Sequence, residues 1–308
     1  GDIPLSGDVS KVITMAESPE LNDLIGKTLI TTDGTTLLGG DDKAGIAIIM
    51  EAANYLMEHP EIQHGPIRIL FTCDEEIGRG VNHVNIEKVG AVVAYTLDGG
   101  GAGDIDVETF SADGLAVSVK GVNIHPSIAK DRMVNALRAA GAFLERLPQD
   151  QAPETTEDRV GFIHPYVLEG GVAEVNIQIL LRDFDTTQLQ VKADLVRDLA
   201  TQIEQEFPGI SIQVNHQKQY RNMADGLPKE PRAVAFAERA HDELGLEYRL
   251  SSIRGGTDGS MLTEKGLPTP NLSSGQHTQH SPLEWACLDE MLQQGQVLIQ
   301  TAVIWGQA

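Results

Sequence analysis

The stretch Arg68–Gly80, "RILFTCDEEIGRG", begins as an alternating apolar strand and ends in three consecutive acids followed by a glycine turn. The acids are Asp74, Glu75 and Glu76. Like charges that lie this close repel one another. A block of negative charge at the end of a buried strand therefore predicts a positive partner at this position, and the rest of the sequence indicates what kind.

The composition is that of an acidic globular protein. The 308 residues contain 23 Lys and Arg against 45 Asp and Glu, which gives a formal net charge of −22. This charge argues against binding to nucleic acid or to an anionic membrane, because both would repel it. No apolar run approaches the ~18 residues of a membrane span. The two cysteines do not make a disulfide framework, so we expect reduced thiols in a cytoplasmic protein.

The regions beside the acidic block predict alternating strands and helices. Residues 41–57 carry apolar side chains at helical spacing, with Asp41 and Asp42 where an N-cap belongs. Residues 66–72 and 91–97 have the pattern of strands, and strands and helices alternate again in the last third of the chain. This alternation predicts an α/β layered sheet.

The pattern changes between residues 110 and 220. Two helices alternate there with three strands in the order β-α-β-α-β, which favours a small α+β sandwich with helices on one face. We therefore expect three segments: a first part of the catalytic domain at 1–109, an inserted domain at 110–220, and the second part of the catalytic domain at 221–308.

Four ligand-type side chains follow strands or precede a helix at one edge of the predicted sheet. They are Asp41, Glu76, Asp98 and His280. Ligands bind at the carboxyl ends of strands in open α/β sheets, so these residues can converge. Carboxylates and imidazole suit zinc and neighbouring divalent metals, and Glu75 would stay free to take a proton. Taken singly, each residue also fits a simpler role, as a solvated loop acid, a helix cap, a turn or a surface histidine.

The motifs together resemble one family. "LLGGDDKAGIA", "TCDEEIGRG", "YTLDGGG", "NIHPSIAK", "LRDFD", "IRGGTDG" and "HSPLEW" are similar, in this order, to those of the peptidase T family, tripeptide aminopeptidases among the di-zinc exopeptidases. The resemblance spans nearly the whole chain. It implies a three-layer α/β zinc-exopeptidase catalytic domain with an inserted α+β lid of the ferredoxin-like type.

The resemblance also implies roles for individual residues. Asp41 would bridge two zinc ions, Glu76 and His280 would complete one of them, and Asp98 would ligate the other. Glu75 would be the general base. His280 is preferred to His277 because it stands four residues before Glu284, as in the family. In the inserted domain the implied roles are oxyanion stabilisation by His125 and substrate binding by Asn123 and Arg182. Arg254, in the second part of the catalytic domain, is also implied to bind substrate.

One departure from the family concerns a His-x-Asp motif expected upstream of "LLGGDDK". It is absent here, so the ligand set of the second zinc is incomplete. We expect either a fragment lacking an N-terminal part, with exposed apolar sheet edge, or a shortened inactive relative. The expected activity is release of the N-terminal residue of short peptides, most often tripeptides. The alternatives are a related zinc dipeptidase, amidohydrolase or deacylase, or a non-catalytic peptide- or metal-binding relative. A homodimer is also expected from the resemblance.

Overall fold

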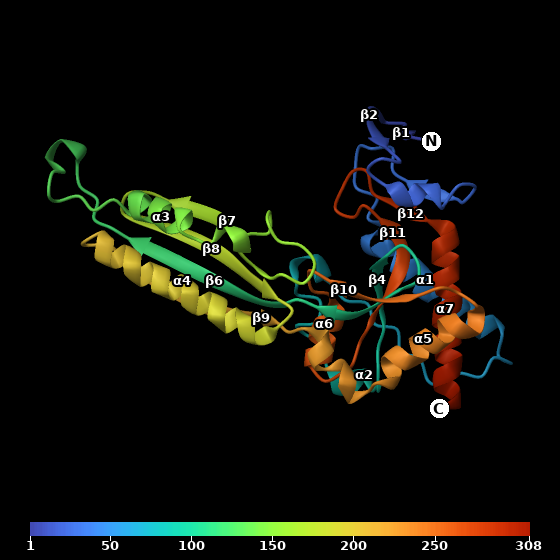
Figure 1. Ribbon diagram of the computed structural model, residues 1–308. Helices are drawn as coiled ribbons and strands as arrows, with labels where there is room; N and C mark the ends of the chain where they lie inside the picture. The colour runs from blue at the N-terminus through green and yellow to red at the C-terminus, as the bar shows by residue number, and fades with distance from the viewer. The chain divides into compact units, whose positions relative to one another are not determined.

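The computed structural model describes residues 1–308 and divides into two compact units (Figure 1). Unit 1 comprises Gly1–Val107, Met223–Ser252 and Thr257–Ala308. Unit 2 comprises Glu108–Asn222 and Ile253–Gly256. The chain thus leaves unit 1 once, completes unit 2, and returns, apart from the four residues Ile253–Gly256 that rejoin unit 2.

Unit 1 is built on a mixed six-stranded sheet whose central strand is β11 (Asn271–His277). β11 pairs in parallel with β4 along one edge, and antiparallel with β5 and then β12 along the other. The remaining strands of the sheet are β3 (Leu29–Thr31), β4 (Thr96–Gly100), β5 (Asp104–Thr109), β10 (Arg249–Ile253) and β12 (Trp285–Cys287). β11 is buried along almost its whole length because it has neighbours on both sides.

Two long helices cover this sheet. α1 (Gly40–Glu58) packs on β4 and β11, and α7 (Leu288–Gln307) packs on β11 and on α1. Their apolar faces share one core with the strands, formed by Ile48, Leu97, Ile105, Ala237 and Leu272. The other elements of unit 1 are the hairpin β1 (Ile3–Leu5) and β2 (Asp8–Ile13), the helices α2 (Ile86–Val89), α5 (Arg232–Leu244) and α6 (Asp258–Glu264), and several short 3-10 turns. The expected α/β class is confirmed.

The predicted strand at 66–72 is wrong. The segment runs between α1 and the acidic block without pairing to any strand, and the predicted strand at 91–97 is reduced to β4, which begins at Thr96. A strand requires a hydrogen-bonded neighbour, and β4 has one only in β11. Apolar side chains of the first segment are accordingly exposed, Ile69 by 41% and Phe71 by 54%.

Unit 2 is a four-stranded antiparallel sheet in the order β7-β8-β6-β9, with two helices on one face (Figure 1). Its elements are β6 (Ser111–Lys120), α3 (Ala136–Glu145), β7 (Phe162–Gly170), β8 (Glu174–Asp183), α4 (Thr186–Glu206) and β9 (Ser211–Tyr220). Alternate residues of β6 and β8, from Leu115 to Val119 and from Val175 to Leu181, are buried against α3 and α4. The order βαββαβ is ferredoxin-like, as the resemblance implied.

The β-α-β-α-β order expected from the sequence lacks β7. Pro165 lies inside this strand, and a proline cannot donate a ladder hydrogen bond, so it weakens the strand pattern. β7 is the edge strand of the sheet, where this loss is tolerated. No helix in the molecule combines the length and the apolar character that crossing a bilayer requires.

Candidate metal centre

Asp41 lies at the N-terminal end of α1, where the chain has not yet become regularly helical. Gly39 occupies the N-cap in the left-handed region with φ of 66°, and Asp41 and Asp42 keep non-helical dihedral angles. The Asp42 carboxylate accepts a hydrogen bond of 3.1 Å from the Gly45 N–H, so Asp42 acts as a cap. Asp41 does not cap the helix, and its side chain is available for another contact.

Glu75 and Glu76 lie in a single 3-10 turn, η2 (Glu75–Ile77), flanked by Asp74 and Gly78 in left-handed conformations. The turn is tied to the start of α6. The Asp258 side chain accepts a hydrogen bond of 2.6 Å from the hydroxyl of Thr72, two residues before Asp74. Glu75 is half-buried and Glu76 is exposed.

Asp98 and His280 are placed by β4 and by the loop after β11. The Asp98 backbone N–H donates to the Asn271 side chain at 3.1 Å, and the Asp98 carboxylate accepts a hydrogen bond of 3.2 Å from the buried Gln276 amide. His280 follows β11 by three residues and has φ of 58°. Because β4 and β11 are parallel neighbours, both side chains emerge at the same end of the sheet.

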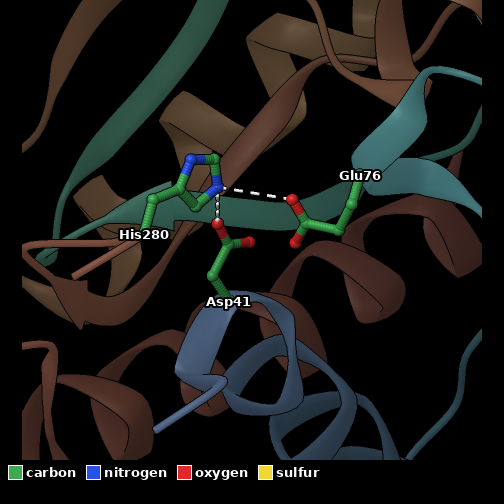
Figure 2. Close-up of side chains that lie close together, drawn as sticks. All are labelled: Asp41, Glu76 and His280. Carbon is green, nitrogen blue, oxygen red and sulfur yellow. Dashed lines mark ion pairs between the residues drawn. The ribbon is translucent and has the colours of Figure 1, made fainter. Parts of the chain in front are cut away.

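Three of the expected ligands meet in space (Figure 2). His280 Nε2 lies 2.9 Å from Asp41 Oδ2 and 3.3 Å from Glu76 Oε2, and the three ligand atoms all lie within 4.8 Å of one another. Two ligand atoms on a tetrahedral zinc are separated by about 3.4 Å, as follows from the usual Zn–N and Zn–O distances of about 2.1 Å. The donor types and their spacing therefore fit one divalent metal ion.

The electrostatics of this region favour a cation. A cavity of about 570 Å³ in unit 1 is lined by seven acids, Asp41, Asp42, Asp74, Glu75, Glu76, Asp98 and Asp258. Burial, followed by the charges of Asp41 and other nearby acids, raises the pKa of Asp42 to about 8. Burial likewise raises the pKa of Glu75 to about 7, with the Asp258 charge adding to the effect.

Asp98 shows the same effect more strongly. Burial raises the pKa of its carboxyl well above the ordinary range, and the charges of Asp42 and Asp41, together with a hydrogen bond to Asp41, add to the rise. Asp98 therefore lies directly beside Asp41. A bound dication would stabilise the ionised forms of all these carboxyls and lower each pKa again.

The remaining predicted residues belong to unit 2. His125 is exposed, and its Nδ1 accepts a hydrogen bond of 3.3 Å from the Ser127 N–H. The neutral imidazole therefore carries its proton on Nε2, the tautomer that can donate to a carbonyl oxygen. Asn123 is an exposed residue of the same loop.

The two arginines of unit 2 are engaged within that unit. Arg182 donates to its neighbouring backbone carbonyl at 2.9 Å and lies over the Tyr220 ring. Arg254 donates through both terminal nitrogens to carbonyl and hydroxyl oxygens in the segment from Thr156 to Val160. Binding of a substrate carboxylate by Arg254 would require it to exchange these bonds, so its role stays a prediction.

Three residues of the region were not singled out as site residues. The sequence pattern predicts only a helix cap at Asp42, Asp258 shares the motif "IRGGTDG" with Arg254, and Glu284 follows His280 by four residues. Asp258 and Glu284 are 6% and 2% exposed. A carboxylate inside an otherwise specific motif is the signal that could have identified Asp258, whereas nothing in the sequence reports the burial of Glu284.

Comparison with known proteins shows the family of the chain. Residues 33–303 match the family model described as peptidase family M20/M25/M40, and the chain belongs to that family. Within it, the chain is 43% identical to peptidase T of Listeria monocytogenes serotype 4a over 301 residues, which are 98% of this chain and 73% of the relative.

Two solved structures share the fold. The aminopeptidase PepT of Bacillus cereus superposes with a TM-score of 0.75 at 26% identity, covering 89% of this chain and 74% of that one. The YXEP protein of Bacillus subtilis, a dinuclear metal-binding peptidase of the M20 family, superposes with a TM-score of 0.64 at 19% identity, covering 85% of this chain and 71% of that one.

Proposed function

We propose that this chain is a metal-dependent aminopeptidase that releases the N-terminal residue of short peptides, with tripeptides as its substrate class. The observation that carries the proposal is the meeting of Asp41, Glu76 and His280, which come from three separate segments of the sequence. The likeness to peptidase T of Listeria monocytogenes supports the substrate class.

In this proposal Asp41, Glu76 and His280 hold one divalent metal ion, and Asp98, beside Asp41, contributes to a second. When bound, the metal supplies positive charge that polarises the scissile carbonyl and makes a water molecule more acidic. The ligand residues come from α1, η2 and the loop after β11. α1 packs on β4 and β11, which holds the Asp41 segment against the sheet, and the Thr72–Asp258 hydrogen bond ties the segment before η2 to α6. Hydrogen bonds to Asp98 from Gln276 orient that carboxylate.

Glu75 takes the proton of the attacking water and later passes it to the leaving amine. Its position next to Glu76 in η2 places it within the same acidic cluster while its side chain stays half-buried. His125, with its proton on Nε2, donates a hydrogen bond to the oxygen on which negative charge develops.

The test replaces Glu75 by Gln and measures release of alanine from trialanine. We expect kcat to fall by about 10²- to 10⁴-fold, the usual contribution of a general base, with metal content unchanged. Asp74→Asn is the matched control, because it removes a charge from the same acidic triplet, and asparagine tolerates the left-handed conformation with φ of 65°. Retention of wild-type turnover by the Glu75 variant would exclude this residue as the base.

Substrate controls separate the neighbouring activities. An aminopeptidase requires a free α-amine, so N-acetyl-trialanine is expected to resist hydrolysis, whereas a deacylase would release acetate from it. A dipeptidase would prefer dialanine to trialanine. Binding of these peptides without hydrolysis, at full metal content, would identify a non-catalytic relative instead.

Three finer features are part of the same proposal. The metal is zinc, because two carboxylates and an imidazole suit that ion. The protein acts in the cytoplasm, where its free Cys73 and Cys287 stay reduced. It forms a homodimer through the edge strand β7, where Tyr166 and Leu168 are more than half exposed. Native mass spectrometry of the purified chain measures both the metal and the subunit number.

A further inference from the structure

Glu284 is a buried carboxylate whose side-chain oxygens accept hydrogen bonds from backbone N–H groups. It is 2% exposed. A buried charge is costly unless hydrogen bonds or an opposite charge compensate it. Each oxygen of Glu284 accepts a hydrogen bond from a backbone N–H group, so a displacement of the carboxylate would also displace the backbone that carries these N–H groups.

The N–H groups belong to the segment that carries Asp41. Gly39 donates to Glu284 Oε2 at 2.7 Å, and Asp41 donates to Glu284 Oε1 at 2.9 Å. The intervening Gly40 passes so close that a Cβ there would lie 3.1 Å from Oε1. The chain from Gly39 to Asp41 thus wraps around the carboxylate as a backbone anion-binding turn at the start of α1, where the helix dipole also favours negative charge.

The backbone of Glu284 is tied to the loop that carries His280. The Glu284 N–H donates to the Ser281 carbonyl at 3.0 Å, directly after His280. Glu284 also immediately precedes β12, whose Trp285 and Ala286 pair with the end of β11. The side chain of one residue therefore holds the Asp41 segment while its main chain holds the His280 loop.

We propose that Glu284 is a positioning residue of the metal centre, which fixes Asp41 relative to His280 before metal binds. The inference rests on the proposed function, because it takes Asp41 and His280 as ligands. Glutamine at this position has the same size but only one accepting oxygen. Its NH₂ group would face one of the two backbone N–H groups, so the segment would move away and the ligand pair would lose its spacing.

The first measurement is the dissociation constant for Zn²⁺ of the full chain, by competition with a chromophoric chelator. We expect Glu284→Gln to weaken Zn²⁺ binding by about 10- to 100-fold, the usual effect of losing an outer partner of a metal ligand. Gly40→Ala crowds the same carboxylate without removing its charge and should weaken binding less. If Glu284→Gln does not fold, Zn²⁺ binding by Gly40→Ala still tests the role of Glu284.

The control for a general loss of stability is Val297→Ala, which opens a cavity in the α7 core away from these loops. It should lower Tm at least as much as Glu284→Gln while leaving the dissociation constant unchanged. With Co²⁺ bound, the visible spectrum should change for Glu284→Gln and Gly40→Ala but not for Val297→Ala.

The His280→Ala variant separates a failure of the metal centre from a failure of the positioning role of Glu284. If the wild-type chain binds Zn²⁺, His280→Ala does not, and Glu284→Gln binds like wild type, the metal centre stands and the role of Glu284 is refuted. Equal weakening by Val297→Ala also refutes it. Failure of the wild-type chain to bind Zn²⁺ would overturn the metal centre and the role of Glu284 together.

Discussion

α1 approaches β4 closely at Gly45, so replacement of this glycine by alanine tests the packing of the helix on the sheet. A Cβ at this position would lie 2.0 Å from the Leu97 carbonyl oxygen and 2.5 Å from Asp42 Oδ1. Because real Cβ atoms stay beyond 3.0 Å from such atoms, α1 and β4 would have to separate by at least about 1 Å. Leu97 precedes Asp98 in the chain and Asp42 follows Asp41, so both clashes adjoin candidate metal ligands.

The magnitude follows from two opposing effects. Alanine in place of glycine inside a helix gains about 1 kcal/mol of helix propensity. Overpacking of a close contact costs about 1–3 kcal/mol, and more when the neighbour is backbone that cannot rotate away. Because one of the two clashes is with the Leu97 carbonyl oxygen, we take the upper cost of about 3 kcal/mol, which gives a net decrease in the free energy of unfolding of about 2 kcal/mol. Metal affinity should also fall, because the start of α1 carries Asp41 and β4 carries Asp98.

Urea denaturation followed by circular dichroism measures the first effect, and Zn²⁺ competition measures the second. Gly141 in α3 is the matched control, since a Cβ there would meet nothing within 4 Å. Gly141→Ala should therefore stabilise the protein by about 0.5–1 kcal/mol. If Gly45→Ala were as stable as Gly141→Ala and bound metal like wild type, the close approach of α1 to β4 would be refuted.

Two further predictions concern charges away from the metal centre. Lys192→Met leaves the Asp183 carboxylate buried without the ammonium group that now lies 2.6 Å away. The free energy of unfolding should therefore fall by about 3–5 kcal/mol. Denaturation measures this loss, and Lys120→Met is the control at an exposed position. Burial raises the pKa of Asp106, so the folded state holds its proton more tightly and stability is lost as pH rises above the unfolded pKa of about 3.9. The Asp106→Asn variant should therefore lose less free energy of unfolding than wild type between pH 4 and 7. If the free energy of unfolding fell equally steeply with pH in both proteins, the raised pKa of Asp106 would be contradicted.

The sequence predicted the parts of the fold that have strong periodicity. The helix at 41–57 and the alternating strands of the inserted segment correspond to α1, β6, β8 and β9 because a buried face imposes its period on the residues. The segment at 66–72 shows the limit of this reasoning. Its apolar alternation is that of a strand, but pattern alone does not supply the neighbouring strand with which it would pair.

The candidate site was predictable to a different degree. Asp41, Asp98 and His280 could be grouped because they begin a helix or lie on or after a strand of one sheet. Glu76 was grouped with them on the basis of a strand at 66–72 that does not form, so its meeting with Asp41 and His280 does not follow from sheet topology. The residues that hold them were not predictable. Glu284 acts through backbone N–H groups of Gly39 and Asp41, and a backbone donor leaves no mark in the side-chain sequence.

The acidic block of Asp74, Glu75 and Glu76 lines a cavity of unit 1 together with acids from other segments. Glu75 and Glu76 face acids from α1, β4 and α6, and their mutual repulsion opposes folding unless something positive compensates it. The main chain and the side chain of Asp41 have different partners. The Asp41 N–H donates a hydrogen bond to the buried Glu284 carboxylate, while the Asp41 carboxylate lies 2.9 Å from His280 Nε2. The fold therefore compensates Glu284 internally and leaves the charge of the Asp41 cluster to a cation.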